Sequence, residues 1–264
     1  MTTDALNAWR GAARETPGSV ALFCDVDGTL APVVPRADEA RVPLEVSRLL
    51  GRLSAKLALV ACVSGRTAAD AKRLVGVGGV VYAGAHGAEL LDPATGEIER
   101  TPELEAWREP IHRFASGLDA AELRRAGVRL EDKDFIQALH WRGAEDDEIA
   151  EALVRQVETA AIDQGFEIHY GRKVIEIRPP VHFNKGVAVS RLIETHAIDH
   201  AAYVGDDMTD VDAFDALHRL RAQQSLATAL CIGVSSEEQP SALAQRADVM
   251  VAGPAGVTEI LRSI

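Results

Sequence analysis

The chain has 264 residues, which suits one large domain with an insertion, or two domains, and is short for three. Apolar residues make up 47% of the chain, and the formal net charge of −12, from 40 acidic and 28 basic residues, disfavours nucleic acid or an anionic membrane as the main partner. Cys24, Cys62 and Cys231 lie in or beside apolar runs and have neither zinc-site nor disulfide spacing, so we interpret them as small buried hydrophobes.

The start of the chain, residues 1–14, lacks the positive segment and apolar stretch of a secretory signal. No later segment approaches the length of about 20 apolar residues that a membrane-crossing helix needs. We therefore expect a cytoplasmic protein, and we expect it to be a monomer.

The first hundred residues alternate short apolar runs with helical patterns. This alternation predicts a βαβαβ arrangement and a parallel sheet. The expected strands are 20–24, 57–64 and 80–83, and the expected helices are 43–53 and 67–74.

The pattern changes in the middle of the chain and returns near residue 185. Between Pro102 and the pair Pro179-Pro180, helical and strand patterns mix in a way that predicts an inserted α+β unit. Its expected helices are 103–118 and 146–164, and its expected strands are 128–131, 136–141, 166–170 and 174–177. After the insertion we expect helices at 185–195, after 210 and at 257–261, with strands at 201–204, 229–234 and 248–251.

Two aspartates directly follow the first expected strand, in the run Asp25-Val26-Asp27-Gly28. Open α/β sheets bind ligands at the carboxyl ends of their strands, and a spacing of two puts both carboxylates on one side of an extended backbone. Gly28 permits the sharp exit that keeps them exposed. One carboxylate could attack a substrate while the other moves a proton. Taken alone, the run fits an Asp-rich turn equally well.

Three further polar groups fall where other expected elements end or begin. They are Ser64-Gly65-Arg66, Asn184-Lys185-Gly186, and the run 205–210, GDDMTD. Each has a simpler explanation, namely a helix N-cap, a surface lysine, and a capping box or acidic turn. Helix capping does not explain why all three sets fall at one sheet edge with the aspartate pair. Together the four sets favour phosphoryl transfer.

A phosphate monoester is an anion, so an acidic site that binds one needs a metal ion. Hard oxygen ligands suit Mg²⁺, and the expected ligands are the Asp25 carboxylate, the Asp27 main-chain carbonyl and the Asp206 carboxylate. Asp207 and Asp210 could orient the bound waters.

The same residues suggest a reaction scheme. Asp25 would attack phosphorus to form an aspartyl-phosphate, and Asp27 would act as acid and then base. Lys185 would neutralise the transferring group, and Ser64 would donate a hydrogen bond to it.

The four motifs DVDGTL, SGR, NKG and GDDMTD, in this order, resemble those of the haloacid dehalogenase (HAD) superfamily of Mg²⁺-dependent aspartate phosphatases. This resemblance implies an α/β fold with a Rossmann-like parallel-sheet core, 1–102 and 181–264, and an inserted α/β cap, 103–180. Segments 84–89 (GAHGAE), 130–133 (LEDK), 140–142 (HWR) and 171–179 (GRKVIEIRP) also resemble the trehalose-6-phosphate phosphatases. That family implies hydrolysis of trehalose 6-phosphate, a small sugar phosphate, to trehalose and phosphate.

Two residue pairs in the insertion suit a neutral disaccharide, which needs both hydrogen-bond donors and acceptors. Glu131 and Lys133 are two apart, and Arg172 and Glu176 are four apart, so on strands each pair projects from one face. Charge pairing on a solvated sheet is the alternative, and the resemblance favours sugar binding. The family usually has Lys where Arg172 stands, so Arg172 could contact a different set of hydroxyls.

The remaining candidate substrate-binding residues are Arg66, His86, Arg142 and Asn184. His86 fits a structural role in a tight turn equally well, and Arg66 could cap helix carbonyls, pair with an acidic residue or touch phosphate. The main alternatives to a trehalose-6-phosphate phosphatase are a sucrose-phosphate or mannosyl-phosphoglycerate phosphatase of the same cap class. A phosphomutase is a further alternative. A receiver-type signalling module is disfavoured because receivers are about half this length and lack an equivalent of Asp27.

Overall fold

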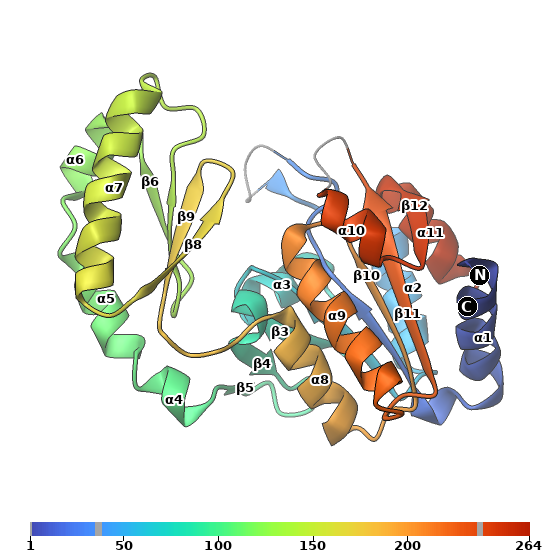
Figure 1. Cartoon of the computed structure of the whole chain (residues 1–264). Helices are drawn as coiled ribbons and strands as arrows, with labels where there is room; N and C mark the ends of the chain where they lie inside the picture. Colours follow the sequence, from blue (N-terminus) through green and yellow to red (C-terminus); the bar gives the residue numbers. More distant parts are fainter. Residues whose placement is uncertain (1, 35–38, 237–239) are drawn as a thin grey trace. The chain divides into compact units, whose positions relative to one another are not determined.

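The computed structural model describes residues 2–34, 39–236 and 240–264. Its contacts divide the chain into two compact units, one formed by Met1–Glu99 with Phe183–Ile264 and the other by Arg100–His182 (Figure 1). We call them the core unit and the inserted unit. No helix in the described part of the chain combines the length and the apolar character needed to cross a membrane.

The core unit contains one eight-stranded sheet in the order β12-β11-β10-β1-β2-β3-β4-β5. In this order, each strand from β12 to β3 runs parallel to its neighbour. At the other end of the sheet, β4 pairs antiparallel with both β3 and β5. The strands are β1 Val20–Cys24, β2 Leu59–Val63, β3 Val81–Gly84, β4 Glu89–Leu91, β5 Ile98–Glu99, β10 His200–Gly205, β11 Thr228–Ser235 and β12 Val249–Ala252. The helices are α1 Thr2–Glu15, α2 Leu44–Ser54, α3 Ala68–Val75, α8 Lys185–Thr195, α9 Met208–Ala222, α10 Ser241–Arg246 and α11 Gly253–Arg262.

The core sheet is covered by helices on both faces, which explains why its central strands are continuously apolar. Within β1, Leu22 and Cys24 pack into the apolar cluster that α1, α2, α3 and α11 complete. Ala21 and Phe23 pack into the opposite cluster, which α8, α9 and α10 complete. Every residue of β1 is buried, so the strand ends inside the molecule and delivers the next residue, Asp25, to a shielded position.

Four elements of the core unit were not predicted. Helix α1 carries the fully buried Trp9 on an apolar face that Ala5, Leu6, Ala12 and Ala13 complete, a helical pattern for which no helix was predicted. Strands β4 and β5 have only three and two residues, too few for a periodic pattern. Helix α10 has six residues and contributes one buried side chain, that of Leu243, so its pattern is equally weak.

The inserted unit is an antiparallel sheet, ordered β6-β7-β9-β8, with helices on one face (Figure 1). The helices pack on that face around Leu139, Ile175 and Ile177. The strands are β6 Arg129–Asp132, β7 Gln137–His140, β8 Glu167–Gly171 and β9 Val174–Arg178, and the helices are α4 Pro102–Glu105, α5 Arg108–Ser116, α6 Ala120–Arg125 and α7 Asp147–Asp163.

The structure corrects two expectations about the inserted unit. The expected helix 103–118 is broken into α4 and α5, and Trp107, at the break, packs edge-on against Phe166 with ring centroids 5.4 Å apart. Arg172 does not lie on a strand, because it occupies the turn between β8 and β9, where Lys173 has φ 55°. The argument that Arg172 and Glu176 project from one face of a strand is therefore wrong.

The face of the inserted sheet opposite to the helices carries charged residues. Glu131, Ala138 and Glu176 lie directly opposite one another on β6, β7 and β9, so their side chains share this face. We call it the polar face of the inserted unit.

Candidate active site

A buried lysine joins two carboxylates at the carboxyl ends of β1 and β10. Lys185 is the first residue of α8, and its Nζ donates to Asp25 Oδ1 at 2.6 Å and to Asp210 Oδ1 at 2.7 Å. Burial opposes the charged form of Lys185, but Asp210 and Asp25 outweigh burial and raise its pKa. The lysine is therefore a fixed positive charge at the end of β1.

Asp210 uses both of its oxygens to hold this arrangement together. Its Oδ1 also accepts from the Tyr203 hydroxyl at 2.7 Å, and its Oδ2 accepts from the main-chain N–H groups of Asp206 and Asp207, at 2.9 Å each. Asp210 thus fixes Lys185 and the turn that carries Asp206. Sequence reasoning did not single out Tyr203, because in the sequence it reads as one more residue of an apolar strand.

The turn after β1 touches the turn after β10. Thr29 Oγ1 donates to Asp206 Oδ1 at 3.1 Å. Gly28 has φ +85°, and a Cβ atom there would lie 2.0 Å from Asp206 Oδ2. Glycine is therefore required at position 28, both for its backbone conformation and because the Asp206 carboxylate occupies the adjacent space.

Asp25, Asp206 and Asp210 form a cluster in which one carboxylate oxygen from each residue lies within 4.8 Å of the other two. The pKa of Asp206 is raised to about 7, mainly because the side chain is buried and next because Asp210 is negatively charged. Burial also raises the pKa of Asp25, against the influence of Lys185. Three hard oxygen donors that repel one another in a buried site suit a divalent cation such as Mg²⁺. Both oxygens of Asp210 already accept hydrogen bonds. Asp25 and Asp206 are therefore the members of the cluster best able to bind a metal ion through an oxygen.

Asp27 faces a different partner. Arg66 Nε donates to Asp27 Oδ2 and its terminal nitrogen donates to Oδ1, both at 2.7 Å. The Asp27 side chain remains 40% exposed, in contrast to the buried Asp25. Of the three alternatives for Arg66, the structure shows pairing with an acidic residue. The main-chain N–H of Arg66 also donates to the buried Ser64 Oγ at 3.1 Å, so the SGR turn and the DVDG turn are connected.

Three other candidates have structural contacts. The imidazole of His86 packs against Gly65, where a Cβ atom would lie 2.8 Å from the ring, and its main-chain N–H donates to the Ser64 carbonyl at 2.9 Å. Asn184 caps α8 through its side-chain oxygen. Asp207 caps α9, where it forms a capping box with Asp210, and it is not part of the carboxylate cluster.

The polar face of the inserted unit carries two sets of ionic contacts, one around Glu131 and one around Glu176. His140 Nε2 lies 2.7 Å from Glu131 Oε2, and Lys133 Nζ donates to Glu176 Oε1 at 2.9 Å. Arg178 donates to Glu176 Oε2. The hydrogen bond from His140 and, more weakly, the charge of Lys133 outweigh burial and lower the pKa of Glu131 to about 2. Glu131 and Glu176 are therefore held as fixed hydrogen-bond acceptors.

The sequence analysis did not name His140 and Arg178 as site residues, although both fall in the quoted HWR and GRKVIEIRP segments. Strand pairing is the missing information: His140 lies two residues from Ala138, which pairs with both Glu131 and Glu176. The other two candidates of this unit, Arg142 and Arg172, are exposed residues in turns.

The core unit and the inserted unit together define the fold of HAD-like hydrolases, and the α/β fold predicted from the sequence is confirmed. A solved trehalose-6-phosphate phosphatase related protein superposes with a TM-score of 0.75 at 24% identity, covering 92% of this chain and 95% of its own. The C-terminal domain of Candida albicans trehalose-6-phosphate phosphatase superposes with a TM-score of 0.74 at 22% identity, covering 98% of this chain and 94% of its own. At these identities the likeness establishes the fold.

The family follows from the sequence comparison. Residues 23–249 match the trehalose-phosphatase family model, and the chain belongs to this family. A trehalose-phosphate phosphatase of Mycobacterium avium is 37% identical over 221 residues, which cover 81% of this chain and 56% of the relative. The match thus spans little more than half the length of that relative.

Proposed function

We propose that this chain is a phosphatase that hydrolyses trehalose 6-phosphate to trehalose and phosphate with the aid of Mg²⁺. The observation that carries the proposal is the buried lysine that joins Asp25 to Asp210 beside Asp206. This arrangement supplies a nucleophile, a fixed cation and a metal-binding carboxylate pair at one sheet edge. Membership of the trehalose-phosphatase family supports the choice of substrate.

Asp25 and Asp206 would hold the Mg²⁺ ion, together with the main-chain carbonyl of Asp27. When bound, the ion supplies positive charge that offsets the charge of the phosphoryl oxygens. Without such compensation, a carboxylate approaching a phosphate meets a repulsion of about 4 kcal/mol per charge pair at 4 Å and an effective dielectric near 20. Asp207 and Asp210 would act through the turn that carries Asp206, since their own side chains cap α9.

In the first half of the reaction, an Asp25 oxygen forms a bond to phosphorus while the bond from phosphorus to the sugar oxygen breaks. Asp27 gives a proton to the departing sugar oxygen, and trehalose leaves. In the second half, Asp27 takes a proton from a water molecule, which attacks phosphorus and releases phosphate from Asp25. Asp27 is 40% exposed and can exchange protons with solvent, but to carry the proton that it gives to the sugar it must first release the two hydrogen bonds from Arg66.

Lys185 and Ser64 would bind the transferring phosphoryl group. Lys185 already lies 2.6 Å from the attacking carboxylate, so its charge falls where negative charge passes from the ester to Asp25. Ser64 accepts the Arg66 N–H with its oxygen, which leaves the hydroxyl proton for donation.

We further propose that the inserted unit binds the sugar through its polar face. Glu131 and Glu176 offer acceptors, while Lys133, His140 and Arg178 offer donors. A neutral disaccharide presents hydroxyl groups that need both, in a fixed arrangement. Arg172, Arg142, Arg66, His86 and Asn184 remain candidates for substrate contacts.

The proposal is tested by phosphate release in the presence of Mg²⁺, comparing trehalose 6-phosphate with glucose 6-phosphate and sucrose 6-phosphate. We expect kcat/KM for trehalose 6-phosphate to exceed the other two values by at least about tenfold, and chelation of the metal to stop turnover. Equal rates on the three esters would contradict the disaccharide assignment. Loss of substrate without an equal yield of free phosphate would indicate a phosphomutase.

A further inference from the structure

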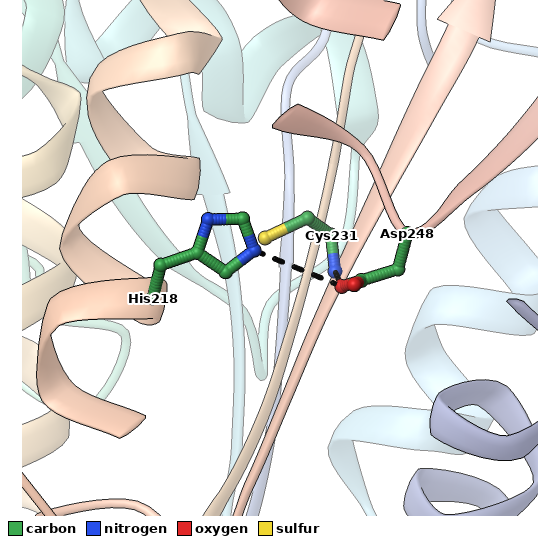
Figure 2. Close-up of side chains that lie close together, drawn as sticks. All are labelled: His218, Cys231 and Asp248. Atoms are coloured by element: carbon green, nitrogen blue, oxygen red, sulfur yellow. Dashed lines mark hydrogen bonds and ion pairs between the residues drawn. The ribbon is translucent and has the colours of Figure 1, made fainter. Parts of the chain in front are cut away.

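A second group of metal-ligating side chains lies outside the site described above. His218 on α9, Cys231 on β11 and Asp248 just before β12 direct their polar atoms at one another (Figure 2). One ligand atom from each, the imidazole nitrogen, the sulfur and a carboxylate oxygen, lies within 4.8 Å of the other two. The three residues are separated by 13 and 17 positions, so no sequence motif links them.

The backbone holds two of the three residues in register. Cys231 N–H donates to Asp248 Oδ2 at 2.8 Å, and Asp248 N–H donates to the Cys231 carbonyl, also at 2.8 Å. His218 is different, because its Nε2 stands 3.9 Å from Asp248 Oδ2, beyond hydrogen-bond length. Ligands bound at about 2.0–2.3 Å in a tetrahedral site lie roughly 3–4 Å apart, so this spacing would accept one metal ion between the two atoms.

The surroundings permit both entry and retention of an ion. The side chains of His218 and Asp248 are 38% and 32% exposed, so an ion can reach them from solvent. Cys231 is fully buried, and its thiol donates to a weak partner, the Phe214 carbonyl, at 3.9 Å. A divalent ion bound by one thiolate, one carboxylate and one neutral imidazole forms a neutral group, which lowers the cost of burying the thiolate.

We propose that His218, Cys231 and Asp248 form a site for one borderline-soft transition-metal ion of the Zn²⁺ class. Sulfur and imidazole ligands favour Zn²⁺ over Mg²⁺, which keeps this site distinct from the oxygen-lined cluster at Asp25. Three protein ligands leave the fourth position for water. On binding, the Cys231 thiol loses its proton to solvent, and the sulfur–metal bond replaces the weak contact with Phe214.

Binding at this site would fasten the C-terminal half of α9 to β11 and to the start of β12. The same helix begins at Met208, immediately after Asp206 and Asp207. The proposal does not depend on the phosphatase activity, because it concerns metal affinity and the stability of the fold.

The test is a Co²⁺ titration of the full chain in excess Mg²⁺ with a non-thiol reductant, since Co²⁺ replaces Zn²⁺ in such sites and reports on its ligands. We expect one equivalent of Co²⁺ to produce a sulfur-to-cobalt charge-transfer band that Zn²⁺ abolishes. His218→Gln should weaken the affinity by at least about tenfold, and Cys231→Ser should remove the band. The His218→Gln variant changes a partly exposed side chain and is expected to fold.

Two controls make the result specific. His196→Gln replaces an exposed histidine at the end of α8, and Cys62→Ser replaces a buried thiol on β2, so both should leave the band unchanged. The proposal is overturned if wild-type protein gives no charge-transfer band, if the band survives in Cys231→Ser, or if His218→Gln binds Co²⁺ as tightly as wild type. In addition, Zn²⁺ added in the presence of excess Mg²⁺ should raise the unfolding temperature of wild type more than that of His218→Gln.

Discussion

At the scale of single residues, the main feature of the proposed site is a lysine that is buried together with two carboxylates. A charge in such a position is tolerated only when partners compensate for the lost hydration. Lys185 has Asp25 and Asp210 at 2.6 and 2.7 Å, and Asp210 is itself held by Tyr203. The arrangement stabilises the fold and positions the proposed nucleophile at the same time.

Replacement of this lysine should therefore affect stability as well as catalysis. In Lys185→Met the two carboxylates face each other without a cation, and we expect the free energy of unfolding to fall by about 3–5 kcal/mol. Denaturant unfolding of the metal-free protein measures this loss. Lys56→Met is a matched control, because Lys56 is exposed and its Nζ donates to the main-chain oxygen of Ile264 at the surface, so a change below about 0.5 kcal/mol is expected. Equal stability of the two variants would contradict the structural role of Lys185.

Arg66 and Asp27 permit a second prediction at this scale. The bidentate pair orients the Asp27 carboxylate, so Arg66→Ala should lower kcat by about tenfold while Asp27→Asn should lower it by about 10²–10⁴-fold. Both residues are partly exposed, and both variants should keep the wild-type unfolding temperature within a few degrees. Steady-state phosphate release from trehalose 6-phosphate gives the comparison. Wild-type kcat in Asp27→Asn would rule out the acid–base role.

At the scale of elements, the site depends on two turns that touch, one after β1 and one after β10. Gly28→Ala tests this contact, because the new Cβ atom would clash with the Asp206 carboxylate. The alanine would also be strained by the φ of +85° at this position. Gly76→Ala is the control, since Gly76 ends α3 with φ +71° and open space around it. We expect each variant to lose about 1 kcal/mol or more of stability. Only Gly28→Ala should lose Mg²⁺ affinity, measured by calorimetry, and unchanged affinity in that variant would contradict the close approach.

The elements also show what a sequence pattern can and cannot predict. Strand β1 was predicted at its observed bounds because five apolar residues precede the Asp-Val-Asp-Gly run, and α8 was likewise predicted at its observed bounds, 185–195. The sequence did not predict the short strands β4 and β5 or the helix α10. Each has too few residues to show a periodic pattern of apolar residues.

The candidate site was partly accessible to the same reasoning. Asp25, Lys185 and Asp206 were selected because parallel strands bring their carboxyl ends to one edge. The pairing of Arg66 with Asp27 and of His140 with Glu131 depends on side-chain directions in turns and on strand register, which no local pattern encodes. His218, Cys231 and Asp248 come together through the pairing of β11 with β12 and the packing of α9 against β11.

At the scale of the whole molecule, the proposed function assigns the chemistry to the core unit and sugar recognition to the polar face of the inserted unit. The chain passes between the units at 99–100 and at 182–183. We propose that the inserted unit acts as a mobile cap. Binding of a phosphate analogue with Mg²⁺ should then reduce the radius of gyration in solution scattering, and an unchanged scattering curve would contradict the cap motion.

The assignment of these two roles to two units predicts that sugar recognition and phosphoryl chemistry can be separated by mutation. Glu176→Gln should raise KM for trehalose 6-phosphate by about ten- to hundredfold, the equivalent of ~1.5–3 kcal/mol for a hydrogen bond to a charged group. Hydrolysis of a small aryl phosphate should be unchanged. Glu151→Gln, on the opposite side of the sheet in α7, should alter neither reaction. Parallel losses on both substrates in Glu176→Gln would place its effect in the core unit instead.

The central claim is that Asp25 carries the phosphoryl group during turnover. Rapid quenching in acid of enzyme mixed with trehalose 6-phosphate and Mg²⁺, followed by peptide mass mapping, tests it directly. We expect one phosphoryl group on the peptide containing β1, assigned to Asp25 and absent in Asp25→Asn. A phosphoryl group on any other residue, or full turnover by Asp25→Asn, would contradict the account.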